Sequence, residues 1–388
     1  MTRRQYGENL AGNVDNLVAR MKNQAYKPQP VRRAWIPKPG SNQKRPLGIP
    51  AYEDKLVQMA IAKTLNAIYE ADFLPCSFGF RPDRGCHDAL KILNVYLEKR
   101  NTNYVVDADI KGFFDHVDHQ WMMKFLEHRI KDRNLLRLIA RFLRSGVMEA
   151  GITRDTPEGT PQGGVVSPIL ANVYLHYVLD LWFEKVVRAK CRGHAYMVRY
   201  ADDFVCCFEY REEAEAFYIA LKERLAKFNL EIAEDKTRII RFGRDAKAGG
   251  NKPGTFDFLG FTHYCDKNRK GQFRVKRRTS RKKYRMSLMR AKEWIRRQRH
   301  LTPKEFMPLL TQKLLGYYGY YAITDNSAMV HQFHNEVRKT LFKALNRRSQ
   351  RRSYTWEGYD RFLKYYPLPR PRVQVNIYEL RTHLSYTW

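Results

Sequence analysis

Two adjacent carboxylates stand at a bend inside an apolar run. Asp202 and Asp203 belong to the stretch Tyr200-Ala201-Asp202-Asp203-Phe204-Val205. The aromatic and β-branched flanks predict two short strands with the aspartates at the bend between them. An Asp-rich surface turn is the alternative. Two neighbouring carboxylates beside buried flanks repel each other and lose hydration, which is costly unless a cation compensates. The pattern therefore favours a site for a hard divalent cation, which prefers carboxylate oxygen.

A second acidic strand lies upstream. Val105 and Val106 begin a predicted strand, and Asp107 and Asp109 share one face of it because strand side chains alternate. The nearby Asp115 and Asp118 are interpreted as ordinary helix-start residues. If Asp109 lies beside Asp202, the two could bring two Mg²⁺ ions to one point. Such ions, about 3.5–4 Å apart, stabilise the attacking and leaving oxygens of a phosphoryl displacement.

Composition points to a polyanionic partner. The chain has 388 residues, 71 Lys and Arg against 40 Asp and Glu, and a formal net charge of +31. This excess favours nucleic acid over a membrane surface. No long uncharged apolar span and no signal peptide are visible, and the six cysteines lack Cys-x-x-Cys spacing. We expect no membrane contact, no zinc site and reduced thiols in a cytoplasm, with the protein associated with a bacterial nucleoid.

Other stretches must position these carboxylates. Residues 31–50 read as a strand, a basic turn and a strand, and the basic tip either closes over phosphates or is a solvated loop. Arg81 and Arg84, in the loop 77–85, either grip a backbone phosphate or bond local carbonyls. Glycines in 159–164 precede a helix that starts near Ser167. Further elements are expected as helices 13–26, 53–71, 86–98 and 211–228, and as strands 230–232 and 256–261, the last followed by a turn.

The composition shifts at about residue 265. From Arg274 to Arg299 basic residues alternate with apolar ones at helical spacing, which predicts a helix with a core face and a cationic face. More helices are expected at 314–322 and 328–346, and a last short strand at 373–377.

A nuclease would need the same metals. A basic hairpin, a glycine bend and a cationic helical region, in that order, favour a polymerase.

Taken together, these motifs resemble the reverse transcriptases of group II introns, the intron-encoded maturases. The resemblance rests on Tyr200-Ala201-Asp202-Asp203 and on Gly159-Thr160-Pro161-Gln162-Gly163-Gly164-Val165-Val166-Ser167-Pro168-Ile169-Leu170-Ala171-Asn172. It extends through Ile36-Pro37-Lys38-Pro39, Leu47-Gly48-Ile49-Pro50, Ser77-Phe78-Gly79-Phe80-Arg81-Pro82, Phe258-Leu259-Gly260-Phe261 and Gly316-Tyr317-Tyr318. The likeness covers about residues 25 to 350.

The resemblance implies an α+β fold, a right-hand polymerase with fingers, a palm and an α-helical thumb. The palm would be an antiparallel sheet backed by helices. The implied division is an N-terminal segment and fingers at 1–100 and a palm, with interleaved finger elements, at 101–265. A helical thumb or maturase region would follow at 266–352, and a C-terminal tail at 353–388, which could dock on the thumb or lie free.

The resemblance also implies roles for single residues. Asp109 and Asp202 would hold two Mg²⁺ ions, with the carbonyl of Ile110 as a further ligand, and Asp203 would complete the catalytic cluster. The incoming nucleotide would meet Lys38, Arg45, Phe114, Gln162 and Lys236. Of these, Phe114 would exclude a 2′-hydroxyl and so select dNTPs, and Lys236 would assist the leaving pyrophosphate. Primer and template contacts are expected from Arg81, Phe258, Leu259, Gly260, Arg281, Lys282 and Arg285.

The sequence departs from the family pattern at three places. The segment ahead of the fingers is shorter than usual, which puts its contacts with intron RNA or template in doubt. A Cys- and His-rich nuclease module is not seen after the thumb, so DNA cleavage is not expected. The loop between Lys38 and Arg45 is slightly longer than is usual.

Three functional readings remain open. The first is an RNA-directed DNA polymerase that extends a primer on an RNA template with dNTPs and also binds structured intron RNA to assist splicing and intron mobility. The second is an RNA-binding splicing factor with secondary polymerase activity, which the intact Asp109, Asp202 and Asp203 disfavour. The third is a domesticated group II-like reverse transcriptase in phage defence or a CRISPR system. Phe114 disfavours an RNA-templated RNA polymerase. The sequence makes no prediction of oligomeric state, cognate RNA or priming mode.

Overall fold

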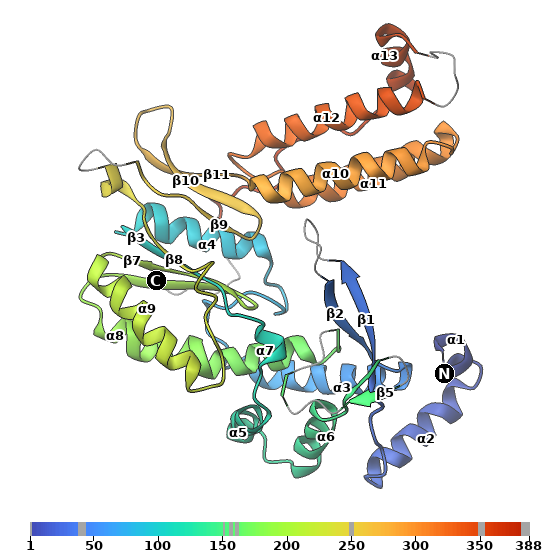
Figure 1. Ribbon diagram of the computed structural model, residues 1–388, viewed down its shortest axis with the longest axis vertical. Helices are drawn as coiled ribbons and strands as arrows, with labels where there is room; N and C mark the ends of the chain where they lie inside the picture. Colours follow the sequence, from blue (N-terminus) through green and yellow to red (C-terminus); the bar gives the residue numbers. More distant parts are fainter. Residues whose placement is uncertain are drawn as a thin grey trace. The chain divides into compact units, whose positions relative to one another are not determined.

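The structure is a computed structural model that describes residues 2–37, 44–149, 152–154, 158–159, 163–247, 252–347 and 354–381. Its chain forms two compact units (Figure 1). The first contains the residues up to Ile92 together with Asn101–Ile240, and the second contains Leu93–Arg100 and Arg241–Arg381. The predicted boundaries of fingers, palm, thumb and tail are not tested by this two-part division and stay a prediction.

A four-stranded sheet lies at the centre of the first unit, with strand order β6-β7-β3-β8. Its strands are β3 (Tyr104–Ala108), β6 (Ala195–Tyr200), β7 (Asp203–Phe208) and β8 (Arg238–Arg241). Strand β7 pairs antiparallel with both β6 and β3. The two predicted strands around the aspartates and the second acidic strand are therefore confirmed. The strand expected at 230–232 is reduced to one bridge, between Ile110 and Ile232.

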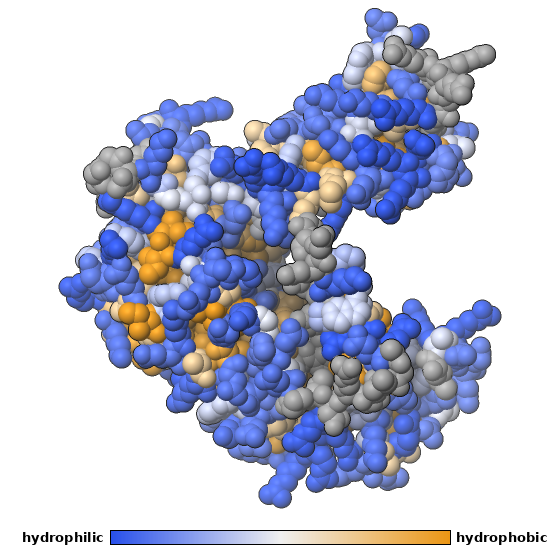
Figure 2. Space-filling view, in the orientation of Figure 1, coloured by the Kyte–Doolittle hydropathy of each residue, from blue (hydrophilic) through white to orange (hydrophobic). Residues whose placement is uncertain are grey.

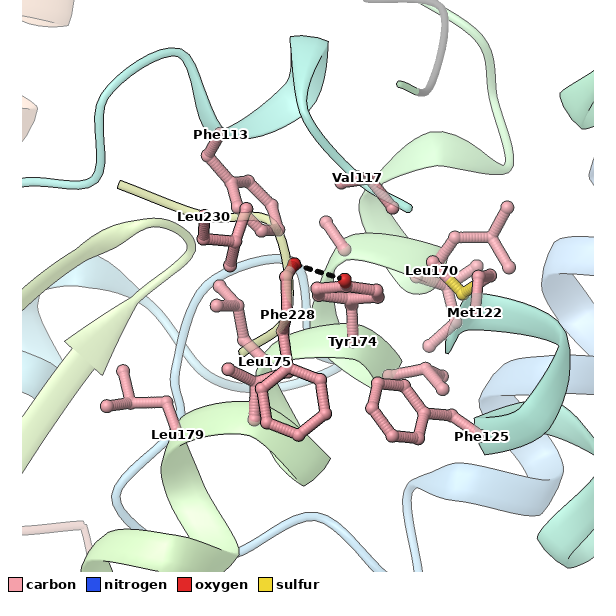
Figure 3. Packing of buried hydrophobic residues seen from close by; sticks show 14 of the residues in the cluster. Phe113, Val117, Met122, Phe125, Leu170, Tyr174, Leu175, Leu179, Phe228 and Leu230 are labelled. Carbon is pink, nitrogen blue, oxygen red and sulfur yellow. Dashed lines mark hydrogen bonds between the residues drawn. The ribbon is translucent and has the colours of Figure 1, made fainter. Parts of the chain in front are cut away.

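Several helices share one hydrophobic core with the sheet. They are α3 (Tyr52–Tyr69), α5 (His119–Arg129), α6 (Arg133–Leu143), α7 (Ser167–Leu175) and α9 (Arg211–Ala226), with a 3-10 turn η1 (Phe113–Asp115). The chain also forms α4 (Cys86–Lys99) and α8 (Arg188–Lys190). Two π-helical segments, η2 (His176–Asp180) and η3 (Phe183–Val187), follow α7. In Figure 3, Phe125 of α5 lies against Tyr174 of α7, whose hydroxyl donates to the carbonyl of Phe228 at 2.8 Å.

The buried face of α3 is formed by Val57, Ile61 and Leu65, spaced four residues apart, whereas Met59 is exposed. The helix-start interpretation holds for Asp118, which caps α5 by accepting from the amide of Trp121. Asp115 instead closes the turn η1.

A second sheet of the first unit has the order β2-β1-β4-β5. Its strands are β1 (Val31–Pro37), β2 (Lys44–Ile49), β4 (Val147–Glu149) and β5 (Ile152–Arg154). The antiparallel β1–β2 pair confirms the predicted basic hairpin, although its tip lies outside the described residues. Ahead of it stand α1 (Arg3–Gly7) and α2 (Leu10–Lys22), so the helix expected at 13–26 starts and ends earlier. The side chain of Asn9 caps α2, which fixes the earlier start.

The second unit begins with a three-stranded antiparallel sheet in the order β11-β10-β9. Its strands are β9 (Phe256–Phe258), β10 (Phe261–Lys267) and β11 (Phe273–Thr279), and the 3-10 turn η4 (Arg244–Lys247) precedes them. Two predictions were wrong here. The turn falls inside the strand expected at 256–261, and the basic helix begins only at Arg281. Val275, Arg277 and Thr279 are buried at every second position, so this part of the basic run follows strand periodicity.

Four helices complete the second unit: α10 (Arg281–Gln298), α11 (Pro303–Tyr321), α12 (Ser327–Leu345) and α13 (Trp356–Tyr365). They share a core to which α13 contributes Tyr359 and Phe362, so this part of the tail docks on the other helices. The strand expected at 373–377 is only a bridge between Ile323 and Val375. Within the described residues, every helix is too short or too polar to cross a lipid bilayer.

Candidate active site

The Tyr-Ala-Asp-Asp turn joins β6 to β7. Ala201 is buried at this bend and adopts the left-handed conformation, with φ +60°, while Asp202 is half-buried and Asp203 is exposed. Strand β3 pairs with β7 in a register that sets Ala108 opposite Phe204. Extending this register by one residue brings Asp109 opposite Asp203. The sheet therefore carries the three predicted carboxylates to the same end of its two central strands.

Lys236 provides a cation at this end of the sheet. Its Nζ lies 2.6 Å from Oδ2 of Asp109, and this hydrogen bond raises the pKa of Lys236, with further contributions from the charges of Asp235 and Asp203. The backbone fixes the pair, because the amide of Ala233 donates to the carbonyl of Asp109 at 2.8 Å. The amides of Lys236 and Thr237 both donate to the carbonyl of Ala233 at 3.0 Å, which closes the turn that carries the lysine.

The donor set suits Mg²⁺ in its chemistry. Asp109 and Asp202 offer carboxylate oxygen, the ligand type that this ion prefers, and the side chain of Asp109 is 29% exposed. Within the described residues, no three acidic, histidine or cysteine side chains are already gathered as a metal-binding group. Instead, the ammonium of Lys236 meets the Asp109 carboxylate. These residues fit a divalent ion that would share the Asp109 carboxylate with Lys236 or replace it there.

Arg199, one residue before the motif, holds the turn from inside the protein. Its guanidinium is fully buried and forms a double hydrogen bond with Asp180, at 2.7 Å and 2.5 Å. It also donates to Asn172 Oδ1 at 3.1 Å, to the carbonyl of Ala201 at 2.8 Å and to Ser77 Oγ at 2.8 Å. Although burial lowers the pKa of Arg199, the interaction with Asp180 outweighs it and raises the pKa overall.

Sequence reasoning missed Arg199 and Asp180 as positioning residues. A lone arginine between apolar strand residues was the available signal, because a buried charge requires a partner. Asp180 lies at the end of the first π-helical segment, 19 residues earlier in the chain, where nothing in the sequence pattern marks it as that partner.

The loop that begins at Ser77 packs against the same turn. The amide of Phe78 donates to the carbonyl of Arg199 at 2.9 Å, and Nδ2 of Asn172 donates to the carbonyl of Gly79 at 2.7 Å. A Cβ atom on Gly79 would lie 2.3 Å from the amide nitrogen of Ala201, so only glycine fits there. Three sequence motifs, the Ser77 loop, the segment ending at Asn172 and the aspartate turn, thus meet at one place.

The glycine bend and Phe114 also meet. Phe114 is half-buried and packs edge-on against the buried ring of Phe113, with ring centroids 5.2 Å apart. A Cβ on Gly159 would lie 3.0 Å from the Phe114 carbonyl oxygen, and one on Gly163 would lie 2.6 Å from the Gly48 carbonyl oxygen. These close approaches explain the glycines and join the bend to both the Phe114 turn and strand β2.

Not every predicted contact residue stands free at this site. Arg81 was expected to contact primer or template, but its side chain is almost fully buried. It pairs with Glu70 at 2.6 Å and donates to the carbonyls of Leu74 and Ser77. The expected contact with primer or template is therefore corrected to the alternative, in which Arg81 bonds local carbonyls. Lys38, Gln162 and the side chain of Arg45 lie outside the described residues.

The predicted primer contacts of the second unit form a tight turn. Leu259 and Gly260, between β9 and β10, both have positive φ, at +48° and +80°. The hydroxyl of Tyr320 donates to the carbonyl of Leu259 at 2.8 Å, while Phe258 points into the core. Any contact of Phe258 with a primer would therefore use its backbone. Arg281, Lys282 and Arg285 are exposed at the start of α10.

A basic groove of about 550 Å³ runs between α10 and α12. Its described lining includes seven basic residues and one acid, Glu336, which pairs with Lys292 and Lys339 at 3.5 Å. The basic residues are Lys292, Arg296, Arg297, Arg299, Lys339, Lys343 and Arg347. Figure 2 shows a mainly hydrophilic surface over these helices. Such a concentration of positive charge suits a polyphosphate ligand.

Comparisons with known proteins agree with this geometry. Residues 36–263 match the family described as reverse transcriptase (RNA-dependent DNA polymerase). Protein YkfC of Escherichia coli (strain K12) is 32% identical over 281 residues, which cover 64% of this chain and 71% of YkfC. Group II intron-encoded protein LtrA of Lactococcus lactis subsp. cremoris is 44% identical over 172 residues. That match covers 43% of this chain but only 28% of the length of LtrA.

The fold has a counterpart among solved structures. Telomerase from Candida albicans, solved in complex with a fragment of telomeric RNA, aligns with a TM-score of 0.51 at 12% identity. The alignment covers 92% of this chain and 68% of the telomerase chain. This likeness concerns the fold alone, and it agrees with the predicted α+β right-hand polymerase with an antiparallel palm sheet. The chain belongs to the reverse transcriptase (RNA-dependent DNA polymerase) family, and the relatives that it resembles include a group II intron-encoded protein.

Proposed function

We propose that this protein is an RNA-directed DNA polymerase, which transfers dNTPs onto a primer paired with an RNA template. The observation that carries the proposal is the register of β3 against β7, which sets Asp109 beside the Asp202–Asp203 turn. Carboxylates that converge at one end of the central strands, on a chain with a net charge of +31, suit phosphoryl transfer on a nucleic acid.

In this proposal Asp109 and Asp202 hold two Mg²⁺ ions, with the carbonyl of Ile110 as a further ligand, and Asp203 completes the acidic cluster. The ions would supply the stabilisation of the attacking and leaving oxygens. The chain's own residues do the positioning. Arg199 fixes the carbonyl of Ala201, and the Ala233 bridge fixes Asp109. Both carboxylates are thus held on rigid strand ends before any substrate binds.

Lys236 and Phe114 have separate tasks. The ammonium of Lys236 is 61% exposed and charged, so it can neutralise the phosphates of the leaving pyrophosphate. The ring of Phe114 packs edge-on against Phe113, and its bulk would exclude the 2′-hydroxyl of a ribonucleotide. The predicted phosphate contacts of Lys38 and Arg45, and the pocket contact of Gln162, belong to the same proposal.

The basic groove between α10 and α12 supports a second role, the binding of structured intron RNA with assistance to splicing. Seven cations line this groove, and Arg281, Lys282 and Arg285, the predicted primer and template contacts, are exposed at the start of α10. RNA affinity that arises from such phosphate contacts falls steeply with salt, because binding releases counterions. A flat salt response would remove this groove from RNA binding.

Primer extension tests the proposed activity. The purified protein is incubated with Mg²⁺, dNTPs and a DNA primer on an RNA template, beside the variants Asp202→Asn and Asp15→Asn. Asp15 serves as the control, because it is an exposed carboxylate on α2. Asp202→Asn should lose activity by several orders of magnitude and Asp15→Asn should retain it. Equal extension by both variants would refute the site assignment.

A further inference from the structure

Phe80 is an exposed aromatic residue in a strained backbone conformation. Its φ is +60°, in the left-handed region that bulky side chains avoid, and 49% of the residue is exposed. Its neighbours behave differently, because Phe78 is fully buried and Arg81 almost so. The protein therefore bears the cost of a strained backbone at Phe80, although a ring that is half exposed gains little stabilisation from burial.

Surrounding contacts force this conformation. On one side of Phe80, the carbonyl of Gly79 accepts a hydrogen bond from Asn172 at 2.7 Å. On the other side, the guanidinium of Arg81 is fixed by Glu70 and by the carbonyl of Ser77 at 2.9 Å. Both flanking residues are thus held from the interior, while the ring of Phe80 between them remains exposed.

The position of Phe80 relative to the acidic turn gives the strain a purpose. A Cβ atom on Gly79 would lie 2.3 Å from the amide nitrogen of Ala201, so the two backbones are in contact. Phe80 follows Gly79 and Asp202 follows Ala201. Because consecutive Cα atoms are about 3.8 Å apart, Phe80 and Asp202 each lie one residue from the same contact.

We propose that the ring of Phe80 is a contact surface for the primer–template hybrid beside the acidic turn, where it stacks on a base or sugar. The inference rests on the proposed polymerase function and adds a substrate-binding residue to it. An aromatic face accepts any base, which suits a polymerase that must bind every sequence. Because the loop is fixed to the interior, the backbone at Phe80 is held before the hybrid arrives, so little backbone freedom is lost on binding.

Phe80→Gly separates this role from a structural one. Glycine removes the ring but adopts positive φ without strain, so a structural residue and a contact residue give opposite results. We expect a melting temperature equal to or above that of the parent protein. Affinity for an RNA–DNA hybrid, measured by fluorescence anisotropy without dNTPs, should fall about five- to a hundredfold, the range for loss of one aromatic–base stack. Phe80→Tyr, which keeps the ring, should bind as the parent does.

Tyr210→Ala is the matched control, because Tyr210 is also exposed but lies beyond the opposite end of β7 from the acidic turn. It should leave hybrid affinity unchanged. Parental affinity in Phe80→Gly, or a marked drop in its melting temperature, would overturn the inference. The proposed function fails separately: if the parent protein binds the hybrid but never extends a primer, the polymerase proposal is refuted while the contact at Phe80 is still measured.

Discussion

Removal of the Arg199 guanidinium should damage both stability and activity. The side chain is fully buried, and its five hydrogen bonds join Asp180, Asn172, Ala201 and Ser77. Arg199→Met would keep the volume but leave the buried Asp180 carboxylate unpaired. Breaking a buried ion pair in this way typically costs about 3–5 kcal/mol. Because a domain is stable by only about 5–15 kcal/mol, this is a large part of the total.

Urea denaturation followed by circular dichroism measures the loss. Arg211→Met is the control, because it breaks an exposed ion pair with Glu215 on α9 and should change the unfolding free energy little. Arg199→Lys should lie between the parent and Arg199→Met, since one ammonium keeps the charge but cannot reproduce the planar fork. A loss below about 1 kcal/mol in Arg199→Met would refute the view that this ion pair supports the turn.

A double variant separates stability from positioning. Arg199→Met combined with Asp180→Leu removes both charges, and replacing a buried pair by apolar residues often restores stability. Primer extension should nevertheless remain impaired, because the carbonyl of Ala201 still lacks its donor. Full recovery of extension in the double variant would show that Arg199 stabilises the fold without positioning the aspartates.

Three further predictions concern other parts of the molecule. Gly79→Ala should reduce primer extension strongly while Gly316→Ala, with open space at its Cβ, should not; equal rates would contradict the close packing on Ala201. Phe114→Ala should incorporate ribonucleotides more readily, and unchanged selectivity in single-nucleotide extension would leave Phe114 with a packing role alone. Burial and the nearby Arg277 lower the pKa of His263 well below 6.5, so the folded protein resists its protonation. Stability should therefore be lost as the pH falls below 6.5, by up to about 1.4 kcal/mol per pH unit. His263→Leu should flatten this slope in urea titrations between pH 6.5 and 5, and a slope equal to the parent's would contradict it.

Local patterns predicted much of the fold. The strand pairs around the acidic turn, the basic hairpin and helices α3, α4, α9 and α12 follow from alternation and helical spacing. The errors fall where two periodicities overlap. Residues 274–279 are rich in basic residues, as α10 is, but Val275, Arg277 and Thr279 are buried at every second position, as in a strand. A dense run of charge hid the change of period.

Tertiary pairing was the other limit. Sequence reasoning named the three aspartates, and the register of β3 against β7 sets Asp109 opposite Asp203. It did not find Arg199, whose partners Ser77, Asn172 and Asp180 come from two distant segments of the chain. Arg81 shows the same limit, since a basic residue in a loop suggests phosphate contact until burial and the Glu70 pair are known. Contacts made only in three dimensions leave no periodic mark on the chain.

The π-helical segments after α7 tie the length of the chain to the angular phase of one side chain. Each such turn corresponds to one extra residue in an otherwise α-helical path. An α-helix rotates by about 100° per residue, so deleting one residue between Leu175 and Asp180 would swing that carboxylate about a quarter turn around the helix axis. Arg199 would then lose its counter-charge although no residue of the ion pair had changed. Length variation should therefore be poorly tolerated in this helix.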